Sequence, residues 1–435
     1  PALVGTRYNG QGFNMNRDMT KLEAYESRAV VEVMNKWDPV IFVDAHATNG
    51  SYMRHAVTYN WGLHPNTDPD IMDYNRGEFS RKAIGPDSYL YKKLGHKSIP
   101  YGNFGKNYSG KVSEGWWTFE DYPRYTTNYA GLRNRLAMLL EVYSYDDFKT
   151  RVDTQYACIY GILQTVAQDK DKIKALIKRA DERGLARTTA GISSDDKVCL
   201  NSSLATLDEI DGGYVSVDSY AVDGDDLVKP TSTDYDEDGF KTAIYFEKEA
   251  VHHIPYYGKF VPTGTEQMGA LRHGITVDRL TEDVEVTDFE WFKIDTLGTK
   301  KSLYEGHYMN VVSGDWTTSK DLTIPSGSFV VSTAQPHGSL AALLLEPKSV
   351  DGLVSWNYLD KLITTEGARY DRFMTSDSVS KARVVFPMWK FHEFSVIPAS
   401  KLTPVEKLAH DETLPAPIES TEPYKGGSSS SGCNA

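Results

Sequence analysis

The chain has 435 residues, of which 40% are hydrophobic, and its formal net charge is −13. This length allows two or three domains, and no apolar run approaches the ~18 residues that a membrane-spanning helix needs, so no transmembrane segment is expected. The negative charge and the lack of a basic patch disfavour nucleic acid as a partner. Three scattered cysteines, Cys158, Cys199 and Cys433, are too few for a disulfide framework or a cysteine-type zinc site.

The first elements along the chain are predicted to be a helix and a buried strand. Residues 20–37 carry apolar side chains at helical spacing, and Thr20 and Glu23 have the spacing of a capping box. Asp38-Pro39 should end this helix. The short apolar run at 40–43 is typical of a strand that is covered on both faces, and His46 lies just past its predicted end.

A second buried strand is predicted at 136–142, and it carries Glu141 near its carboxyl end. Two helices should follow, each with one apolar face: Val152, Tyr156, Ile159, Leu163 and Val166 in the first, and Ile173, Leu176, Ile177 and Ala180 in the second, which should stop near Gly184. These elements predict an α/β fold, with a mixed, twisted sheet flanked by helices.

The pattern changes near residue 188. Short alternating segments broken by Gly, Pro and Asp turns predict a β-rich C-terminal domain, with short helical pieces at 267–273 and 339–345. The expected division is therefore an α/β part at 1–187, a β-rich accessory domain at 188–419, and a flexible Gly/Ser tail at 420–435.

Both His46 and Glu141 fall at the carboxyl ends of predicted strands, which is where open α/β sheets collect their ligand sites. A histidine in this place can equally be a hydrogen-bonded core residue. A carboxylate in an apolar strand can likewise form a structural salt bridge, here with Arg133 or Arg135.

A glycine-rich loop before the first helix adds Arg7, Asn16 and Arg17. Arginine binds a carboxylate through two parallel hydrogen bonds, and an adjacent amide can complete the contact. The alternative is a surface loop whose arginines pair with nearby acids.

Three segments together resemble the carboxypeptidase A-like zinc metallocarboxypeptidase family. They are Gly12-Phe-Asn-Met-Asn16-Arg17-Asp18, Phe42-Val-Asp-Ala-His46 and Leu139-Leu-Glu141-Val-Tyr-Ser, and they occur in the family's order. Further similar segments at 48–50, 123–125, 131–135, 344–347 and 351–357 point to a bacterial branch. The resemblance implies that residues 1–187 are the C-terminal portion of a zinc carboxypeptidase-like catalytic domain.

The resemblance also implies a role for each matching residue. His46 would be the third zinc ligand, and Glu141 would be the general base and acid that acts on zinc-bound water, whose pKa the metal lowers to about 7. Asn16 and Arg17 would bind the C-terminal carboxylate of a peptide, and Arg7 would polarise the scissile carbonyl. The family's mobile tyrosine corresponds best to Tyr122, although Tyr125 and Tyr129 lie in the same region.

One part of the family's site is missing from this sequence. The first two zinc ligands come from an upstream His-x-x-Glu motif, which the chain does not contain. A catalytic zinc site needs three protein ligands, so His46 is insufficient alone. We expect that the chain begins inside the catalytic domain and that two further ligands lie upstream of Pro1. The alternatives are a separate N-terminal fragment that completes the domain, a pseudoenzyme, and substitute ligands from His55 or His64.

Two other segments carry weaker signals. The acids Asp234, Asp236 and Asp238 alternate as in a calcium loop, but Tyr245 occupies the twelfth position, where a glutamate should lie. An acidic turn is the alternative. The C-terminal tail is similar to the start of sorting tails on bacterial surface proteins, so an extracellular, periplasmic or cell-surface location is expected, although an ordinary disordered tail would have the same composition.

The sequence thus predicts a zinc-dependent metallocarboxypeptidase that hydrolyses the C-terminal peptide bond of peptides with a free C-terminal carboxylate. One alternative is a zinc-dependent deacylase of small acyl-amino acids, an activity that relatives of the family have. The other is a non-catalytic protein that binds peptide C-termini.

Overall fold

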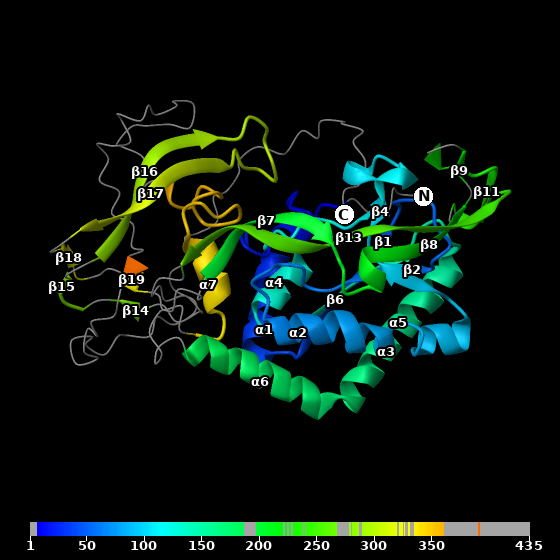
Figure 1. The fold of residues 1–435 in the computed structure, drawn as a ribbon, viewed down its shortest axis with the longest axis horizontal. Helices are drawn as coiled ribbons and strands as arrows, with labels where there is room; N and C mark the ends of the chain where they lie inside the picture. The colour runs from blue at the N-terminus through cyan, green and yellow to red at the C-terminus, as the bar shows by residue number, and fades with distance from the viewer. Residues whose placement is uncertain are drawn as a thin grey trace.

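The computed structural model describes residues 7–186, 197–267, 278–360 and 390–391, apart from short gaps at 221, 224–225, 228, 238, 240, 280, 287–288, 320–321, 325, 327–328 and 331–334. In this part of the chain, α6 runs along the lower edge of the molecule, α5 rises from there towards the right, and the β16–β17 hairpin lies at the upper left (Figure 1). No helix among the described residues is long and apolar enough to cross a bilayer.

The first helix begins later than the sequence predicts. A 3-10 turn, η1 (Met15–Arg17), precedes α1 (Tyr25–Trp37). The Asp18 carboxylate accepts hydrogen bonds from the backbone N–H groups of Glu23, at 3.1 Å, and Ala24, at 2.9 Å. Leu22 has a φ of 56°, which a right-handed helix does not allow. The predicted capping box is therefore wrong, because the chain turns at Leu22 before the helix starts.

A mixed four-stranded sheet forms the centre of the α/β half. Its strands are β1 (Ile41–Thr48), β6 (Leu136–Tyr143), β2 (Val57–Asn60) and β3 (Ser98–Pro100), in the order β1-β6-β2-β3. β1 and β6 are parallel, β6 and β2 antiparallel, and β2 and β3 parallel. The predicted α/β class with a mixed sheet flanked by helices is confirmed at this level.

Helices cover both faces of the sheet. On one face, α5 (Phe148–Gln168) and α6 (Lys170–Ala186) pack against alternate β6 residues such as Leu136 and Met138. On the other face, α1 and α4 (Thr126–Leu132) pack around Ala137. Since side chains alternate along a strand, Glu141 points to the same face as Ala137 and lies on the α4 side of the sheet.

The two central strands differ in burial. Every residue of β6 is buried, whereas the residues of β1 are half-buried or exposed. Within the described chain β1 pairs with β6 alone and lies at the edge of the sheet. An apolar strand with one open edge is a site at which a further strand can pair.

Helix α5 presents the opposite face from the one its periodicity predicts. Phe148, Val152, Tyr156, Ile159 and Leu163 are exposed, with Tyr156 at 63% and Leu163 at 62%. Small residues face the core instead: Ala157, Cys158 and Gly161 are buried, together with Ile162. Gly161 explains why: a Cβ on it would lie 2.1 Å from the Ala83 carbonyl oxygen, so only glycine allows this close approach. In α6, by contrast, the predicted residues Ile173, Leu176 and Ala180 are buried.

Short elements connect the main strands of this half. They are α2 (Pro69–Tyr74), the π-helical turn η2 (Asn75–Phe79), α3 (Ser80–Ala83), the π-helical turn η3 (Leu90–Leu94), β4 (Asn103–Phe104), the 3-10 turns η4 (Lys106–Tyr108) and η5 (Val112–Glu114), and β5 (Trp116–Trp117).

Strands dominate the second half of the chain. They are β7 (Lys197–Thr206), β8 (Tyr214–Tyr220), β9 (Val222–Asp223), β10 (Asp226–Leu227), β11 (Ser232–Tyr235), β12 (Lys241–Tyr245), β13 (Glu249–Gln267), β14 (Asp278–Arg279), β15 (Val284–Val286), β16 (Phe289–Thr299), β17 (Asn310–Ser319), β18 (Leu322–Ile324), β19 (Phe329–Val330) and β20 (Lys390–Phe391). The 3-10 turn η6 (Asp211–Gly213) precedes β8, and α7 (Gly338–Leu345) matches the helix predicted at 339–345. The other predicted short helix begins at Gln267, which ends β13, and its remaining residues lie outside the described chain.

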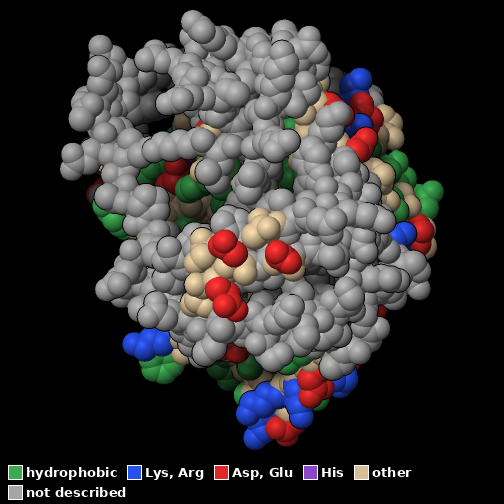
Figure 2. Space-filling model, turned by 90° about the vertical axis from the view of Figure 1, so that its left-hand side faces the viewer, with side chains coloured by type: hydrophobic (Ala, Val, Ile, Leu, Met, Phe, Trp, Pro, Cys, Tyr) green, Lys and Arg blue, Asp and Glu red, His purple; other side chains and the backbone are tan. Residues whose placement is uncertain are grey.

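The two halves share a β-sheet. The long strand β13 pairs with β5, with Tyr256 opposite Trp116, and the sheet order is β4-β5-β13-β7. The predicted boundary at 187/188 and the tail at 420–435 fall outside the described residues, so both stay predictions. Viewed from its left-hand side, the molecule shows separate acidic side chains near the centre and mixed basic and acidic ones at the lower edge (Figure 2).

Candidate functional site

The register of the two parallel strands brings His46 and Glu141 together. His46 is opposite Glu141, and Asp44 is opposite Leu139. Because residues two apart on a strand share a face, Asp44, His46 and Glu141 all project to the α4 side. His46 lies within β1, near its carboxyl end, and not beyond the strand as the sequence suggests.

His46 has a carboxylate beside one of its ring nitrogens. Asp44 Oδ1 lies 2.8 Å from His46 Nε2, and both side chains are partly buried. Burial of the ring lowers the pKa of His46. The contact with Asp44 and the negative charge of Glu141 raise it by more, so the pKa of His46 is raised overall. With Nε2 facing Asp44, Nδ1 is the ring nitrogen turned away from it and the one suited to a metal.

Glu141 is 5% exposed. Burial raises the pKa of its carboxyl to about 7; nearby Asp44 raises it further, whereas His46, Arg7 and Arg17 oppose the shift. A carboxyl with a pKa near neutrality suits proton transfer. The alternative partner Arg135 is engaged elsewhere, with Asp38 at 2.6 Å and Asp181 at 3.3 Å.

The loop that carries Asn16 and Arg17 lies against the start of α4. Arg17 is 4% exposed, and its guanidinium carbon lies 4.3 Å from the centroid of the Tyr125 ring. The backbone N–H and the hydroxyl of Thr126 each lie 3.3 Å from Asn16 Oδ1. The same Thr126 hydroxyl donates to Asp44 Oδ2. A chain of contacts thus links the loop to His46.

Arg7 and Tyr122 are the remaining predicted site residues, and they have different neighbours. Arg7 is exposed, and its charge acts on Glu141, so it lies within electrostatic reach of the site. Tyr122 is half-buried, with its ring 4.1 Å from the Arg124 guanidinium carbon and 6.0 Å from the Tyr125 ring. Its substrate-binding role stays a prediction.

Tyr108 is a tyrosine that the sequence did not single out. Its side chain is 37% exposed, and burial raises its pKa to about 12, with Glu120, Arg17 and Glu141 close enough to affect it. Arg17 and Glu141 of the candidate site thus act on the Tyr108 pKa, whereas Arg124, Glu120 and Asp121 act on that of Tyr122. In the sequence, only its position in a Gly/Asn-rich loop could have drawn attention to it.

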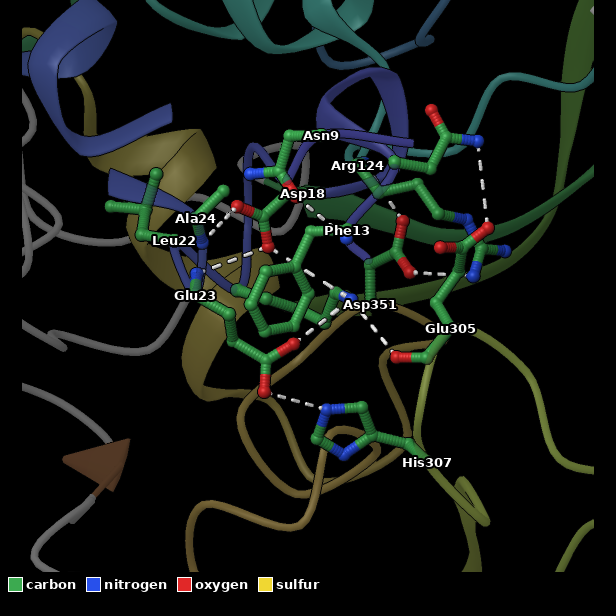
Figure 3. A network of polar contacts seen from close by, with 12 residues as sticks. Asn9, Phe13, Asp18, Leu22, Glu23, Ala24, Arg124, Glu305, His307 and Asp351 are labelled. Carbon is green, nitrogen blue, oxygen red and sulfur yellow. Dashed lines mark hydrogen bonds and ion pairs between the residues drawn. The ribbon is translucent and has the colours of Figure 1, made fainter. Parts of the chain in front are cut away.

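Residues from the β-rich half contact Arg124 and the segment that follows the Asn16–Arg17 loop (Figure 3). Asp351 accepts a hydrogen bond of 2.9 Å from the Arg124 backbone N–H and pairs with its guanidinium at 3.3 Å. His307 Nε2 lies 2.9 Å from a Glu23 carboxylate oxygen. Lys21 donates to the Glu305 carbonyl at 3.3 Å. These contacts connect Lys21, Glu23 and Arg124 with a part of the chain that is distant in sequence.

The described residues do not form a complete metal site. No group of three or more His, Cys, Asp or Glu side chains among them is arranged to hold a metal ion. His55 Nε2 accepts from the Asp218 N–H at 3.0 Å, and His64 Nδ1 accepts from the Asn66 N–H at 3.1 Å. Burial lowers the pKa of His55 to about 4 and that of His64 to about 3, so both are neutral acceptors inside the protein, which does not support the prediction of substitute ligands.

The structure describes only part of the predicted calcium loop. The Tyr245 hydroxyl donates to Asp234 Oδ2 at 2.8 Å, so the residue at the twelfth loop position binds the first acid. Asp236 lies in the turn, and Asp238 is outside the described residues. Calcium binding stays a prediction.

The sequence of this chain is similar, at low identity, to a small set of known proteins. Over 368 residues the chain is 23% identical to proteins named Carboxypeptidase 2 from Trichophyton equinum and Trichophyton rubrum. The match covers 81% of this chain and 63% of each relative, so the chain spans less than two thirds of the length of the curated relatives it matches. No family model and no solved structure matches. These relatives are fungal, and the bacterial affiliation stays a prediction. The similarity supports, at this level, a relationship to a carboxypeptidase family.

Proposed function

We propose that this chain carries one part of the active site of a zinc-dependent metallocarboxypeptidase. The observation that supports this most is the β1–β6 register, which sets His46 beside Glu141 on the face that also receives the Asn16–Arg17 loop. Three separate segments thus supply a metal-type ligand, a proton-transfer group and a carboxylate-binding group. The relatives named carboxypeptidases support the same class of hydrolase.

In this proposal the chain's own residues recognise the end of a peptide. Arg17 and Asn16 bind the C-terminal carboxylate, which restricts cleavage to the last peptide bond because an internal bond offers no such group. Arg7 lies near the carbonyl that reacts and stabilises its negative charge. Tyr108, or Tyr122 as the sequence predicts, closes over the substrate.

Glu141 moves the proton. Its carboxyl, with a pKa raised to about 7, accepts a proton from the attacking water and gives it to the leaving amine. Zinc, when bound, would supply the acidity of that water.

His46 fits one position of a zinc site, since the Asp44 carboxylate beside Nε2 is the usual partner of a zinc-bound histidine. A catalytic zinc needs two more protein ligands, and we propose that they lie upstream of Pro1 or on a separate N-terminal fragment that pairs with the open edge of β1. Export to an extracellular, periplasmic or cell-surface location is part of the same proposal.

A second candidate function is a non-catalytic binder of peptide C-termini. It is favoured by the lack of a three-ligand cluster among the described residues. Such a protein would keep the Asn16–Arg17 contact with the carboxylate and would not need Glu141.

One experiment on the full chain separates these functions. Binding of a short peptide with a free C-terminus is compared with binding of its C-terminal amide, and release of the last amino acid in the presence of zinc is followed by mass spectrometry. A peptidase prefers the free acid and releases the residue, and Glu141→Gln abolishes release while it leaves binding intact. Preference without release or bound zinc supports the binder. Equal binding of acid and amide refutes both.

A further inference from the structure

The Asp44 carboxylate connects two parts of the candidate site. Its Oδ1 lies 2.8 Å from His46 Nε2, and its Oδ2 accepts from the Thr126 hydroxyl. The side chain is 19% exposed, so it is held mainly by these two contacts and not by bulk water. The Asp44 carboxylate lies close to His46 Nε2, but it is not in the direction in which an Nε2–H group would point, so the contact does not have the geometry of a hydrogen bond.

Thr126 holds the other side of this arrangement. It is the first residue of α4, where the backbone N–H has no partner inside the helix. That N–H points to Asn16 Oδ1 at 3.3 Å. A backbone N–H can only donate, so the Asn16 atom beside it is the amide oxygen, and the NH₂ group is turned to the other side.

The single proton of the Thr126 hydroxyl is directed at Asp44. Its two possible acceptors are Asp44 Oδ2 and Asn16 Oδ1, the latter at 3.3 Å. A carboxylate oxygen is a stronger acceptor than a neutral amide oxygen. Asp44 therefore receives the hydroxyl proton on one oxygen and faces the His46 ring with the other.

From these contacts we propose that Asp44 and Thr126 are positioning residues that set two orientations at once. Asp44 holds the His46 ring with the proton on Nε2 and the lone pair on Nδ1. Thr126 holds Asp44 in place and fixes the Asn16 amide with its NH₂ group available to an incoming carboxylate. This inference rests on the proposed function, because it assigns Asn16 to carboxylate binding and His46 to a metal.

The spacing of two residues between Asp44 and His46 allows this contact. Positions two apart on a strand project to the same face, so a carboxylate at 44 reaches the ring at 46 without a change of backbone. A carboxylate beside a metal-binding histidine supports the ligand geometry in many metal sites. Here the same carboxylate is fastened, through Thr126, to the loop that recognises the substrate end.

The test uses the full chain and three variants: Asp44→Asn, Thr126→Val and Thr126→Ser. The first readout is the tautomer of His46, observed by ¹⁵N NMR at a pH where the ring is neutral. We expect an Nε2-protonated ring in the wild type and in Thr126→Ser, and a mixture of tautomers in Asp44→Asn and Thr126→Val. A merely structural role for Asp44 would leave the tautomer unchanged.

The second readout is the preference for a free-acid peptide over its amide. Loss of one charge-assisted contact corresponds to about a tenfold change in affinity, so Thr126→Val should lower the preference about tenfold, and Thr126→Ser should keep it within about twofold of the wild type. Circular dichroism checks that each variant is folded.

The outcomes separate the two proposals. If the wild type binds acid and amide equally, the carboxylate contact of the proposed function is refuted. If the wild type prefers the acid, but Thr126→Val retains that preference and Asp44→Asn retains the wild-type tautomer, the positioning role is refuted and the carboxylate contact stands.

Discussion

Arg124 and Asp351 are 227 residues apart in the chain, yet the backbone and the guanidinium of Arg124 both contact the Asp351 carboxylate. Their side chains are 4% and 1% exposed. The guanidinium carbon also lies 4.1 Å from the Tyr122 ring and 5.4 Å from the Trp356 ring, so the cation is enclosed by aromatic faces. The pair joins the α/β half to the segment that follows α7.

We expect Asp351→Asn to destabilise the protein strongly. Removing one partner leaves a buried guanidinium without its counter-charge, which costs about 3–5 kcal/mol of unfolding free energy. Urea unfolding measures this loss. The matched control is Asp153→Asn, which breaks the exposed pair with Lys149 and should cost less than about 1 kcal/mol. Similar losses in both variants would contradict the assignment of a buried pair.

We expect Arg17→Lys to weaken binding of free-acid peptides by about tenfold or more, because lysine lacks the planar fork that binds a carboxylate through two hydrogen bonds. Binding of the C-terminal amide should change little. Calorimetric titration of both peptides checks this. Arg81→Lys is the control, since Arg81, on α3, has a side-chain exposure of 71% and pairs with Asp87. Equal weakening for acid and amide would show that Arg17 acts through folding alone.

We expect His64→Asn to reduce the acid sensitivity of the protein. The His64 side chain is buried and neutral, with its pKa lowered from 6.5 to about 3, so the unfolded chain binds more protons than the native chain as pH falls below 6.5. Stability that is present above pH 6.5 is therefore lost on acidification, by about 2 kcal/mol between pH 7.5 and pH 5.

An asparagine oxygen can accept the same hydrogen bond from Asn66 without titrating. Urea unfolding of the two proteins at pH 7.5 and pH 5 measures the difference. If the variant loses as much stability on acidification as the wild type, His64 is not a buried neutral group.

We expect Leu163→Gln on α5 to have little effect on stability and Gly161→Ala to destabilise the protein. The apolar periodicity of the helix predicts the reverse. Leu163→Gln changes an exposed side chain and should alter stability by less than about 0.5 kcal/mol. Gly161→Ala adds a methyl group that would lie 2.1 Å from the Ala83 carbonyl oxygen and should cost about 1–3 kcal/mol. Thermal unfolding of both variants checks the orientation of the helix; a costly Leu163→Gln with a harmless Gly161→Ala would reverse it.

The elements that sequence predicts best here are those with a continuous signal. The apolar runs around Val43 and Leu139 correspond to β1 and β6, and their parallel pairing brings His46 and Glu141 side by side. The spacing in α6 and the apolar run of α7 also lead to the observed elements. In each case the local pattern and the tertiary packing agree.

The parts that sequence misses depend on contacts that spacing does not show. The start of α1 is set by Asp18 and by the positive φ of Leu22. The buried face of α5 is chosen by the close approach of Gly161, so the larger apolar residues point outward. Thr126 is an ordinary polar residue in sequence, and only the fold places it between Asn16 and Asp44.

The pairing of β13 with β5 affects the order in which parts of the protein can fold during synthesis. Trp116 and Trp117 take up their partners Tyr256 and Tyr257 only after about 140 more residues have been synthesised. During that time the strand next to β4 lacks one neighbour, and such long-range pairing is slow to form. Folding of the α/β half is therefore completed late, and Trp116 and Trp117 should report that step as a slow change in fluorescence during refolding.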